Sequence, residues 1–329
     1  MSTLSNVFTK VTKFLKEYMI MVAIIALVVV TIIVEPKFLS TQNITNIMGQ
    51  LGALSFVALG MTFAIVSGFI DLSVAGIINI VAVTTISLIQ PLGQVPALLI
   101  GLALGALLGF INSSLVVSAG AMSMFDALFI TFGMSTVYSA MALIISGGST
   151  QQMRWLETDI SIFNTIGSGT VSIFPVPIII FLVCLVLLHI FLSKTYRGRS
   201  IMLSGGNKTA ARLAGIPVKT TVMLIFTISG LMAALGGIVQ FSRITHVSPI
   251  IGFGFELNAI LAVVIGGTTL KGGNGGVIRT LLGVLLVTLL SNCMNLLGVG
   301  THIQSILSGA VFITAIWLDN RKELKGAYA

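Results

Sequence analysis

The sequence predicts an all-α integral membrane protein of about ten transmembrane helices with both termini in the cytoplasm. Hydrophobic residues make up 56% of the 329-residue chain and charged residues 8%, whereas soluble domains carry about 25% charged residues. Apolar runs near the ~20 residues that cross a bilayer recur along the chain. The basic residues lie between those runs, as they do in membrane proteins that obey the positive-inside rule.

The apolar runs divide the chain into three parts. Residues 1–17 predict a cytoplasmic amphipathic helix, with lysines opposite an apolar face. Residues 18–320 predict a single transmembrane domain, and residues 321–329 a cytoplasmic tail. The expected spans are 18–34, 49–67, 72–90, 95–118, 124–146, 174–193, 221–242, 257–270, 277–297 and 302–318, of which 257–270 is short for a span.

The distribution of basic residues sets the orientation. With the N-terminus inside and the spans alternating, 14 of the 17 Lys and Arg residues fall on the inside, and only Lys37, Arg154 and Arg243 fall outside. If one span in the middle were absent, the basic residues after it would change sides and the inside bias would be lost. The three outer basic residues have two interpretations, either snorkelling at the membrane surface or docking of an acidic delivery protein.

Two segments share a pattern that predicts an inverted repeat. Ile70-Asp71-Leu72-Ser73 opens the third span, and Phe255-Glu256-Leu257-Asn258 opens the eighth from the opposite side. Each segment belongs to a four-span half, spans two to five and seven to ten, and such repeats are common in transporters. An acid in the first turn of a helix stabilises the free N–H groups there, so Asp71 and Glu256 are candidate caps. Acids at membrane depth are also often functional, so a place in the translocation pathway for Asp71, Ser73, Glu256 and Asn258 stays open.

Other polar and small residues inside the spans have competing interpretations. Asn292 and Asn295 lie one turn apart and would offer a sugar both donors and acceptors, or would instead bond neighbouring helices. Gly101, Gly105 and Gly109 form two successive GxxxG steps, which predict a close helix–helix approach.

Several function classes are disfavoured by what the sequence lacks. It has no G-x-x-x-x-G-K-[ST] phosphate loop, so ATP binding by this chain is not expected. No metal or cofactor is expected, because Cys184 and Cys293 fall inside apolar runs and the three histidines are scattered. Aromatic residues are few, which disfavours nucleic acid as a partner. Buried carboxylates are scarce, which argues against ion-driven transport.

The segment 194–220 predicts a cytoplasmic loop that carries a short helix. Gly205-Gly206-Asn207 indicates a turn with Asn207 as the N-cap, and Lys208–Ala214 a helix that stops at Gly215. Ala210, Ala211 and Ala214 have small side chains, which would let a cytoplasmic partner approach this helix closely. The alternative interpretation is a surface helix that only links two spans.

The motif G-G-N-K-T-A-A-R-L-A-G-I at 205–216 resembles the signature of permeases of sugar-type ABC importers, the ribose, arabinose and galactose group. Similar matches extend over about residues 40 to 320. They are S-G-F-I-D-L-S-V at 67–74, S-P-I-I-G-F-G-F-E-L-N-A-I at 248–260, G-G-T-T-L-K-G-G at 266–273 and N-C-M-N-L-L-G at 292–298. The chain departs at Ala75, where the family usually has Gly, and at 123–126, which would affect substrate choice.

The resemblance implies a permease subunit in a bacterial plasma (inner) membrane that moves a monosaccharide or a similar small polar solute. ATP-binding subunits would dock on the coupling helix through Gly206, Asn207, Ala210, Ala211, Arg212, Leu213 and Gly215. A second permease copy or paralogue would complete the pathway in the lipid bilayer, and an extracytoplasmic sugar-binding protein would deliver the solute. The alternatives are a secondary carrier of small polar solutes and a non-transporting membrane scaffold.

Overall fold

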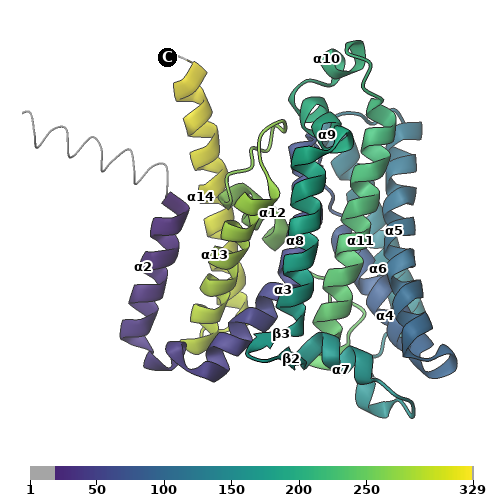
Figure 1. The fold of residues 1–329 in the computed structure, drawn as a ribbon, viewed down its shortest axis with the longest axis vertical. Helices are drawn as coiled ribbons and strands as arrows, with labels where there is room; N and C mark the ends of the chain where they lie inside the picture. Colours follow the sequence, from purple (N-terminus) through teal and green to yellow (C-terminus); the bar gives the residue numbers. More distant parts are fainter. Residues whose placement is uncertain (1–18, 328–329) are drawn as a thin grey trace, which may run out of the picture.

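The computed structural model describes the backbone of residues 19–327, which forms one bundle of helices (Figure 1). The amphipathic helix expected at 1–17 lies outside the described residues. Within the described part, seven helices are long and apolar enough to cross a membrane. They are α3 (Thr41–Val66), α4 (Val74–Leu92), α5 (Gln94–Ser118), α6 (Met124–Ser146), α8 (Val176–Lys194), α11 (Val218–Ile244) and α13 (Val277–Leu296).

Three further helices correspond to the remaining expected spans. They are α2 (Met19–Val34), α12 (Phe255–Ile265) and α14 (Thr301–Ala327). The 257–270 segment is only partly helical, because α12 ends at Ile265 and a turn-rich loop follows to residue 276. No break in the backbone marks the expected tail boundary at 320, since α14 continues through Ala327.

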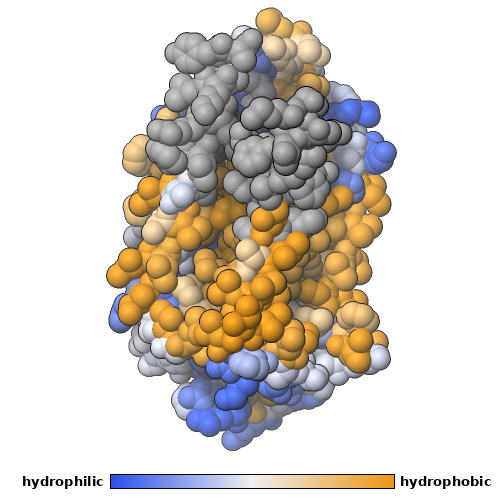
Figure 2. Space-filling model, turned by 90° about the vertical axis from the view of Figure 1, so that its left-hand side faces the viewer, coloured by the Kyte–Doolittle hydropathy of each residue, from blue (hydrophilic) through white to orange (hydrophobic). Residues whose placement is uncertain are grey.

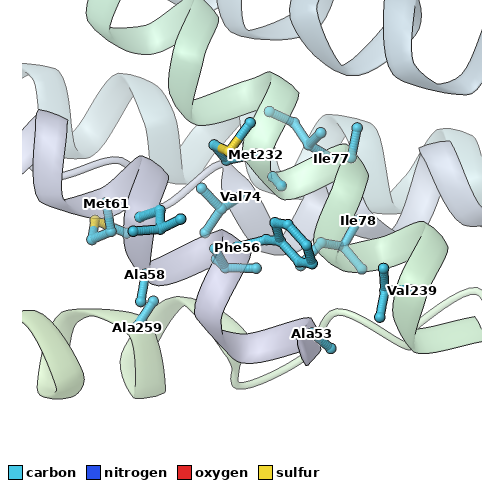
Figure 3. Close-up of a cluster of buried hydrophobic side chains, with 14 of the residues drawn as sticks. Ala53, Phe56, Ala58, Met61, Val74, Ile77, Ile78, Met232, Val239 and Ala259 are labelled. Carbon is cyan, nitrogen blue, oxygen red and sulfur yellow. The ribbon is translucent and has the colours of Figure 1, made fainter. Parts of the chain in front are cut away.

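Helix α3 lies at the centre of the bundle and packs against α8, α11, α12 and α13. Its sequence is apolar around most of its circumference, which is typical of a helix buried on all sides. Figure 3 shows part of this core, in which side chains of α3 lie among those of its neighbours: Ala53, Phe56, Ala58 and Met61 of α3; Val74, Ile77 and Ile78 of α4; Met232 and Val239 of α11; and Ala259 of α12.

Helices α5 and α11 approach so closely that backbone touches backbone. A Cβ atom added at Gly105 would collide with the side chain of Ala234 and lie 2.7 Å from the carbonyl oxygen of Gly230. One at Gly109 would collide with the carbonyl oxygen of Phe226. The close approach expected from the GxxxG steps is therefore confirmed, with α11 as the partner helix.

The two ends of the bundle carry different short elements (Figure 1). One end holds the 3-10 helices η1 (Pro36–Leu39) and η2 (Met153–Trp155), helix α7 (Ser161–Ser168) and two small sheets. Strand β1 (Gln151–Gln152) pairs antiparallel with β4 (His246–Val247), and β2 (Thr170–Val171) with β3 (Phe174–Pro175). This is the end expected outside the cell, and it is called the outer end below.

The opposite end holds α9 (Tyr196–Gly206) and α10 (Lys208–Leu213). The expectation of a lone helix after a Gly205-Gly206 turn was wrong. Both glycines belong to the last turn of α9, which continues directly into Asn207 and α10. In Figure 1 the C-terminal end of α14 and the first residues of α2 lie on this same side.

A broad apolar band crosses the middle of the face drawn in Figure 2, with hydrophilic residues beyond it at the outer end. Helices α2 and α14 carry large exposed apolar side chains, among them Ile25, Val29, Val30, Ile33, Ile303, Ile306 and Ile313. An exposed apolar surface of this extent is typical of a protein surrounded by lipid.

Candidate solute cavity and coupling surface

An irregular segment precedes the helix of the eighth expected span. After α11 the chain forms β4 and then an irregular segment, 248–254, before α12 begins at Phe255. The backbone N–H of Gly252 donates a hydrogen bond to Oδ1 of Asn79 in α4, at 2.7 Å. A Cβ at residue 252 would collide with the Ala75 carbonyl, so only glycine allows this approach. Irregular backbone at membrane depth needs such protein partners, because lipid offers no hydrogen bonds.

A polar cavity of about 270 Å³ lies beside the start of α12. Four helices line it: α3 through Gln50, Ala53 and Leu54, α11 through Gln240 and Arg243, α12 through Phe255 and Asn258, and α13 through Thr288, Ser291 and Asn295. Gln50 lies in the first half of α3 and Arg243 in the last turn of α11, so the cavity belongs to the outer half of the bundle. Amide and hydroxyl groups in an otherwise apolar bundle can hold a polar solute.

Arg243 is half-buried in the cavity wall instead of lying free on an outer loop. A Cβ at Gly49 would lie 2.9 Å from the Nε atom of Arg243, so glycine at position 49 makes room for the guanidinium group. Within the part of the chain whose side chains are described, Arg243 has no acidic partner. Lys37 and Arg154, the other two outer basic residues, are exposed in η1 and η2.

The two asparagines of α13 have different surroundings. Asn292 is buried and exchanges side-chain hydrogen bonds with Asn43 of α3, at 2.8 and 3.1 Å. This is the interhelical role that the sequence left open as the alternative. Asn295 instead lines the cavity, and its Oδ1 accepts a hydrogen bond from Nε2 of Gln304 at 2.8 Å.

The two acids of the expected repeat also differ. Glu256 is half-buried in the first turn of α12, as expected, next to the lining residue Phe255. Asp71 precedes α4 instead of lying in its first turn, because its Oδ1 accepts the N–H of Ser73 at 3.0 Å and bends the chain there.

A chain of buried hydrogen bonds continues from Asp71. The hydroxyl of Ser73 donates to Asp71 and accepts from Nδ2 of Asn112 at 2.7 Å. The hydroxyl of Tyr138 donates to Oδ1 of Asn112 at 2.7 Å. The network joins the start of α4 to α5 and α6, and it lies apart from the cavity described above.

Helix α10 forms the exposed tip of the end that the sequence predicts to be cytoplasmic. Oδ1 of Asn207 accepts the N–H of Ala210 at 2.9 Å, which confirms the expected N-cap, and Gly215 follows the helix with φ +78°. Ala210 and Arg212 are exposed, and Leu213 is 85% exposed. The expected face is only partly available, because Ala211 points inward and packs against Phe69 and its neighbours.

Lys208 anchors α10 to two other segments of the bundle. Its Nζ atom donates to the carbonyl oxygen of Met122 at 2.7 Å and lies 3.7 Å from the centroid of the Phe69 ring. A cation over an aromatic face is attracted by the ring. Partial burial lowers the pKa of Lys208 to about 8. Phe69 belongs to the same turn as Asp71, so α10 contacts the segment that carries the buried network.

Three glycine-containing motifs that are far apart in the sequence meet under α9. The N–H of Gly273 donates to the carbonyl oxygen of Val66 at 2.7 Å. A Cβ at Gly205 would collide with that same carbonyl, and one at Gly272 would lie 2.7 Å from the amide nitrogen of Gly68. The end of α3, the end of α9 and the loop before α13 are therefore in direct backbone contact.

Sequence reasoning missed several residues of these sites. Gln50, Gln240 and Ser291 line the cavity, and each is a polar residue within an apolar span, which is the signal that selected Asn292 and Asn295. Lys208 and Tyr138 carried no local signal, because their partners come from distant segments.

A bundle of helices long and apolar enough to cross a membrane, with a polar cavity and an exposed short helix at one end, is typical of membrane permeases. The family model described as branched-chain amino acid transport system / permease component matches residues 43–316, and the chain belongs to that family.

Curated relatives match over nearly the whole chain. The ribose import permease protein RbsC of Haemophilus influenzae is 35% identical over 94% of this chain and 95% of its own, and RbsC of Bacillus subtilis is 36% identical over 90% of each. The L-arabinose transport system permease protein AraH of Escherichia coli is 34% identical over 93% of this chain and 91% of its own. A solved structure described as an inward-facing metal-chelate type ABC transporter shares the fold, with a TM-score of 0.50 at 14% identity over 93% of this chain and 99% of that one.

Proposed function

We propose that this permease imports a monosaccharide or a related small polar solute as part of an ATP-driven transporter. The observation that carries the proposal is the similarity over nearly the full chain to permeases of ribose, arabinose and allose transport. The capped helix α10, which exposes Arg212 and Leu213 at the cytoplasmic end, supports a separate ATP-binding partner.

The proposed assembly contains a second permease copy or paralogue, two ATP-binding subunits below, and an extracytoplasmic sugar-binding protein above, in the bacterial inner membrane. ATP binding would move the coupling residues Gly206, Asn207, Ala210, Arg212, Leu213 and Gly215. Lys208 and the glycine contacts would pass that movement to the end of α3 and to the loop before α13. Lys37 and Arg154 would face the acidic surface of the binding protein.

The proposed topology has ten crossings with both termini inside and an inverted repeat of α3–α6 and α11–α14. Support comes from the two acids, since Asp71 lies in the irregular segment just before α4 and Glu256 lies in the first turn of α12. The irregular segment 248–254 before α12 would form the outer half of the eighth crossing.

Co-expression with candidate ATP-binding subunits tests this function. We expect the native chain to retain the ATPase in a pull-down and to support ATP-driven sugar uptake in vesicles. Arg212→Glu should abolish both, because it reverses a charge in the last turn of the exposed helix. Lys219→Glu is the matched control, since Lys219 is also exposed and basic but lies outside α10.

The outcomes separate the alternatives. A native chain that moves sugar without an ATPase would establish the secondary-carrier hypothesis instead. A chain that moves no solute under either condition would favour the scaffold hypothesis. Retention of the ATPase by both variants would leave the importer in place and remove Arg212 from the docking surface.

A further inference from the structure

We propose that the cavity between α3, α11, α12 and α13 is a permease-side binding site for an uncharged polyhydroxylated solute, with Arg243 as its central donor. The inference rests on the proposed function and adds to it a specific site inside the permease. The site would receive the solute on the outer side before the bundle changes conformation.

The chemistry of the lining residues carries the first step. Gln50, Gln240, Asn258 and Asn295 each offer a carbonyl acceptor and two N–H donors, and the Thr288 and Ser291 hydroxyls can both donate and accept. A solute hydroxyl also donates and accepts. Several hydroxyls on one small ring therefore match this wall, whereas an apolar solute would leave the amide groups without partners.

Arg243 carries the second step. Its planar guanidinium group can donate two parallel hydrogen bonds to neighbouring oxygens, and it does so best where no carboxylate already occupies it. No acid lines the cavity, and within the described side chains Arg243 has no acidic partner. A half-buried arginine without a partner has free donors for an incoming solute. The absence of a lining carboxylate also disfavours a cationic solute.

The size and position of the cavity give the third argument for a small solute. Pockets for drug-sized ligands are about 300–1,000 Å³, so a cavity of about 270 Å³ suits a smaller molecule. The first part of α12 places Asn258 in the cavity wall. We assign an uncharged solute because six of the seven polar lining residues are neutral amides or hydroxyls, and Arg243 supplies the only charge in the lining.

The first test measures uptake kinetics of the assembled transporter and retention of the ATP-binding subunit. Arg243→Met should raise KM for the transported sugar about tenfold or more, and Arg243→Lys should recover part of the loss. The amount of ATP-binding subunit retained in a pull-down should equal that of the native chain, which shows that the variant folds and assembles. Unchanged KM in Arg243→Met would contradict the proposal.

The second test keeps Arg243 intact. Cys184 and Cys293 are replaced by serine, and Ser291→Cys is placed in the cavity wall, with Ser149→Cys on the exposed outer loop as control. The transported sugar, chosen from D-ribose, L-arabinose and D-allose, should slow labelling of Ser291→Cys by a small thiol reagent at least threefold and leave Ser149→Cys unaffected.

Three results would overturn the inference. The first is an equal labelling rate of Ser291→Cys with and without sugar, and the second is equal slowing of Ser291→Cys and Ser149→Cys. The third is protection of Ser291→Cys by gluconate but by no neutral sugar, which would assign an anionic solute instead. If ATPase binding and ATP-driven uptake remain normal while protection fails, the importer function stands and only the cavity assignment falls.

Discussion

At the residue scale, several buried polar side chains in this permease hydrogen-bond to residues of other helices. Asn292 bonds Asn43, and Ser73 joins Asp71 to Asn112. Unsatisfied polar groups are costly in a bilayer, so each pair fixes the relative position of two helices. Arg243 differs, because it lies in a cavity wall without an acidic partner, and that difference separates a structural residue from a candidate binding residue.

The Asp71 network gives the first residue-scale prediction. Asp71→Asn keeps an acceptor for Ser73 and removes the charge, so we expect uptake within about threefold of native. Asp71→Leu removes the acceptor and leaves buried donors unpaired, at a cost of about 1–3 kcal/mol. It should lower the thermal unfolding temperature of the purified transporter. If Asp71→Asn abolishes uptake at native stability, the carboxylate has a role in transport beyond hydrogen bonding.

The contacts of Lys208 give the second residue-scale prediction. Lys208→Met keeps the apolar stem but loses the hydrogen bond to Met122 and the attraction to Phe69, the latter about 0.5–2 kcal/mol. We expect ATPase retention with several-fold slower uptake, and recovery in Lys208→Arg. Because burial lowers the pKa of Lys208 to about 8, raising the pH from 7 to 9 removes most of its charge. The uptake ratio of native to Lys208→Arg should therefore fall over that interval, and a constant ratio would argue against a role for the charge.

At the element scale, packing depends on small residues and on one broken helix. Helices α5 and α11 touch through Gly105 and Gly109, and α12 is short because the preceding segment packs on α4 through Gly252. Hydropathy alone cannot distinguish a short helix plus irregular backbone from a full span, since both are apolar. The break sets the N-terminus of α12 beside the cavity.

The α5–α11 contact is testable by adding volume. Gly105→Val would force side-chain atoms into Ala234 and the Gly230 carbonyl, and overpacking of this kind costs about 1–3 kcal/mol. We expect a lower unfolding temperature and a lower yield of the detergent-purified protein. Gly133→Ala in α6 is the control, because nothing lies within 4 Å of a Cβ there and Ala favours the helix. Equal stability of the two variants would show that the α5–α11 contact is adaptable.

At the scale of the whole molecule, the chain brings distant motifs to a common end. Segments around Gly68, Gly205 and Gly273 meet at the end of α9, whereas the cavity lies in the outer half of the bundle among α3, α11, α12 and α13. The coupling surface and the candidate solute site therefore lie at opposite ends of α3 and α11. Helix α13 also runs from the glycine contacts to the cavity, so a movement of α10 can reach the cavity through α3, α11 and α13.

The proposed topology predicts which loops an impermeant thiol reagent reaches in intact cells. In a chain without native cysteines, Lys37→Cys should be labelled from outside. Ala214→Cys and Asn274→Cys should react only after the membrane is opened, because they lie in the inner loops. Ala214 and Asn274 are both exposed in the structure. Labelling of Asn274→Cys from outside would show that the eighth segment is re-entrant, and the ten-crossing topology would then be wrong.

Much of this protein is determined by its sequence alone. The apolar runs, the basic inner loops, the Asn207 cap and the motifs at 67–74, 205–216 and 266–273 predict a helical permease of this family, because hydropathy, capping and backbone turns are local properties. The tertiary structure decided that α9 precedes α10 without a turn, that Ala211 points inward, that Asn292 bonds Asn43, and that Arg243 joins Gln50 and Gln240 around a cavity. These features depend on which distant helices lie side by side, and the local pattern of a sequence does not contain that information.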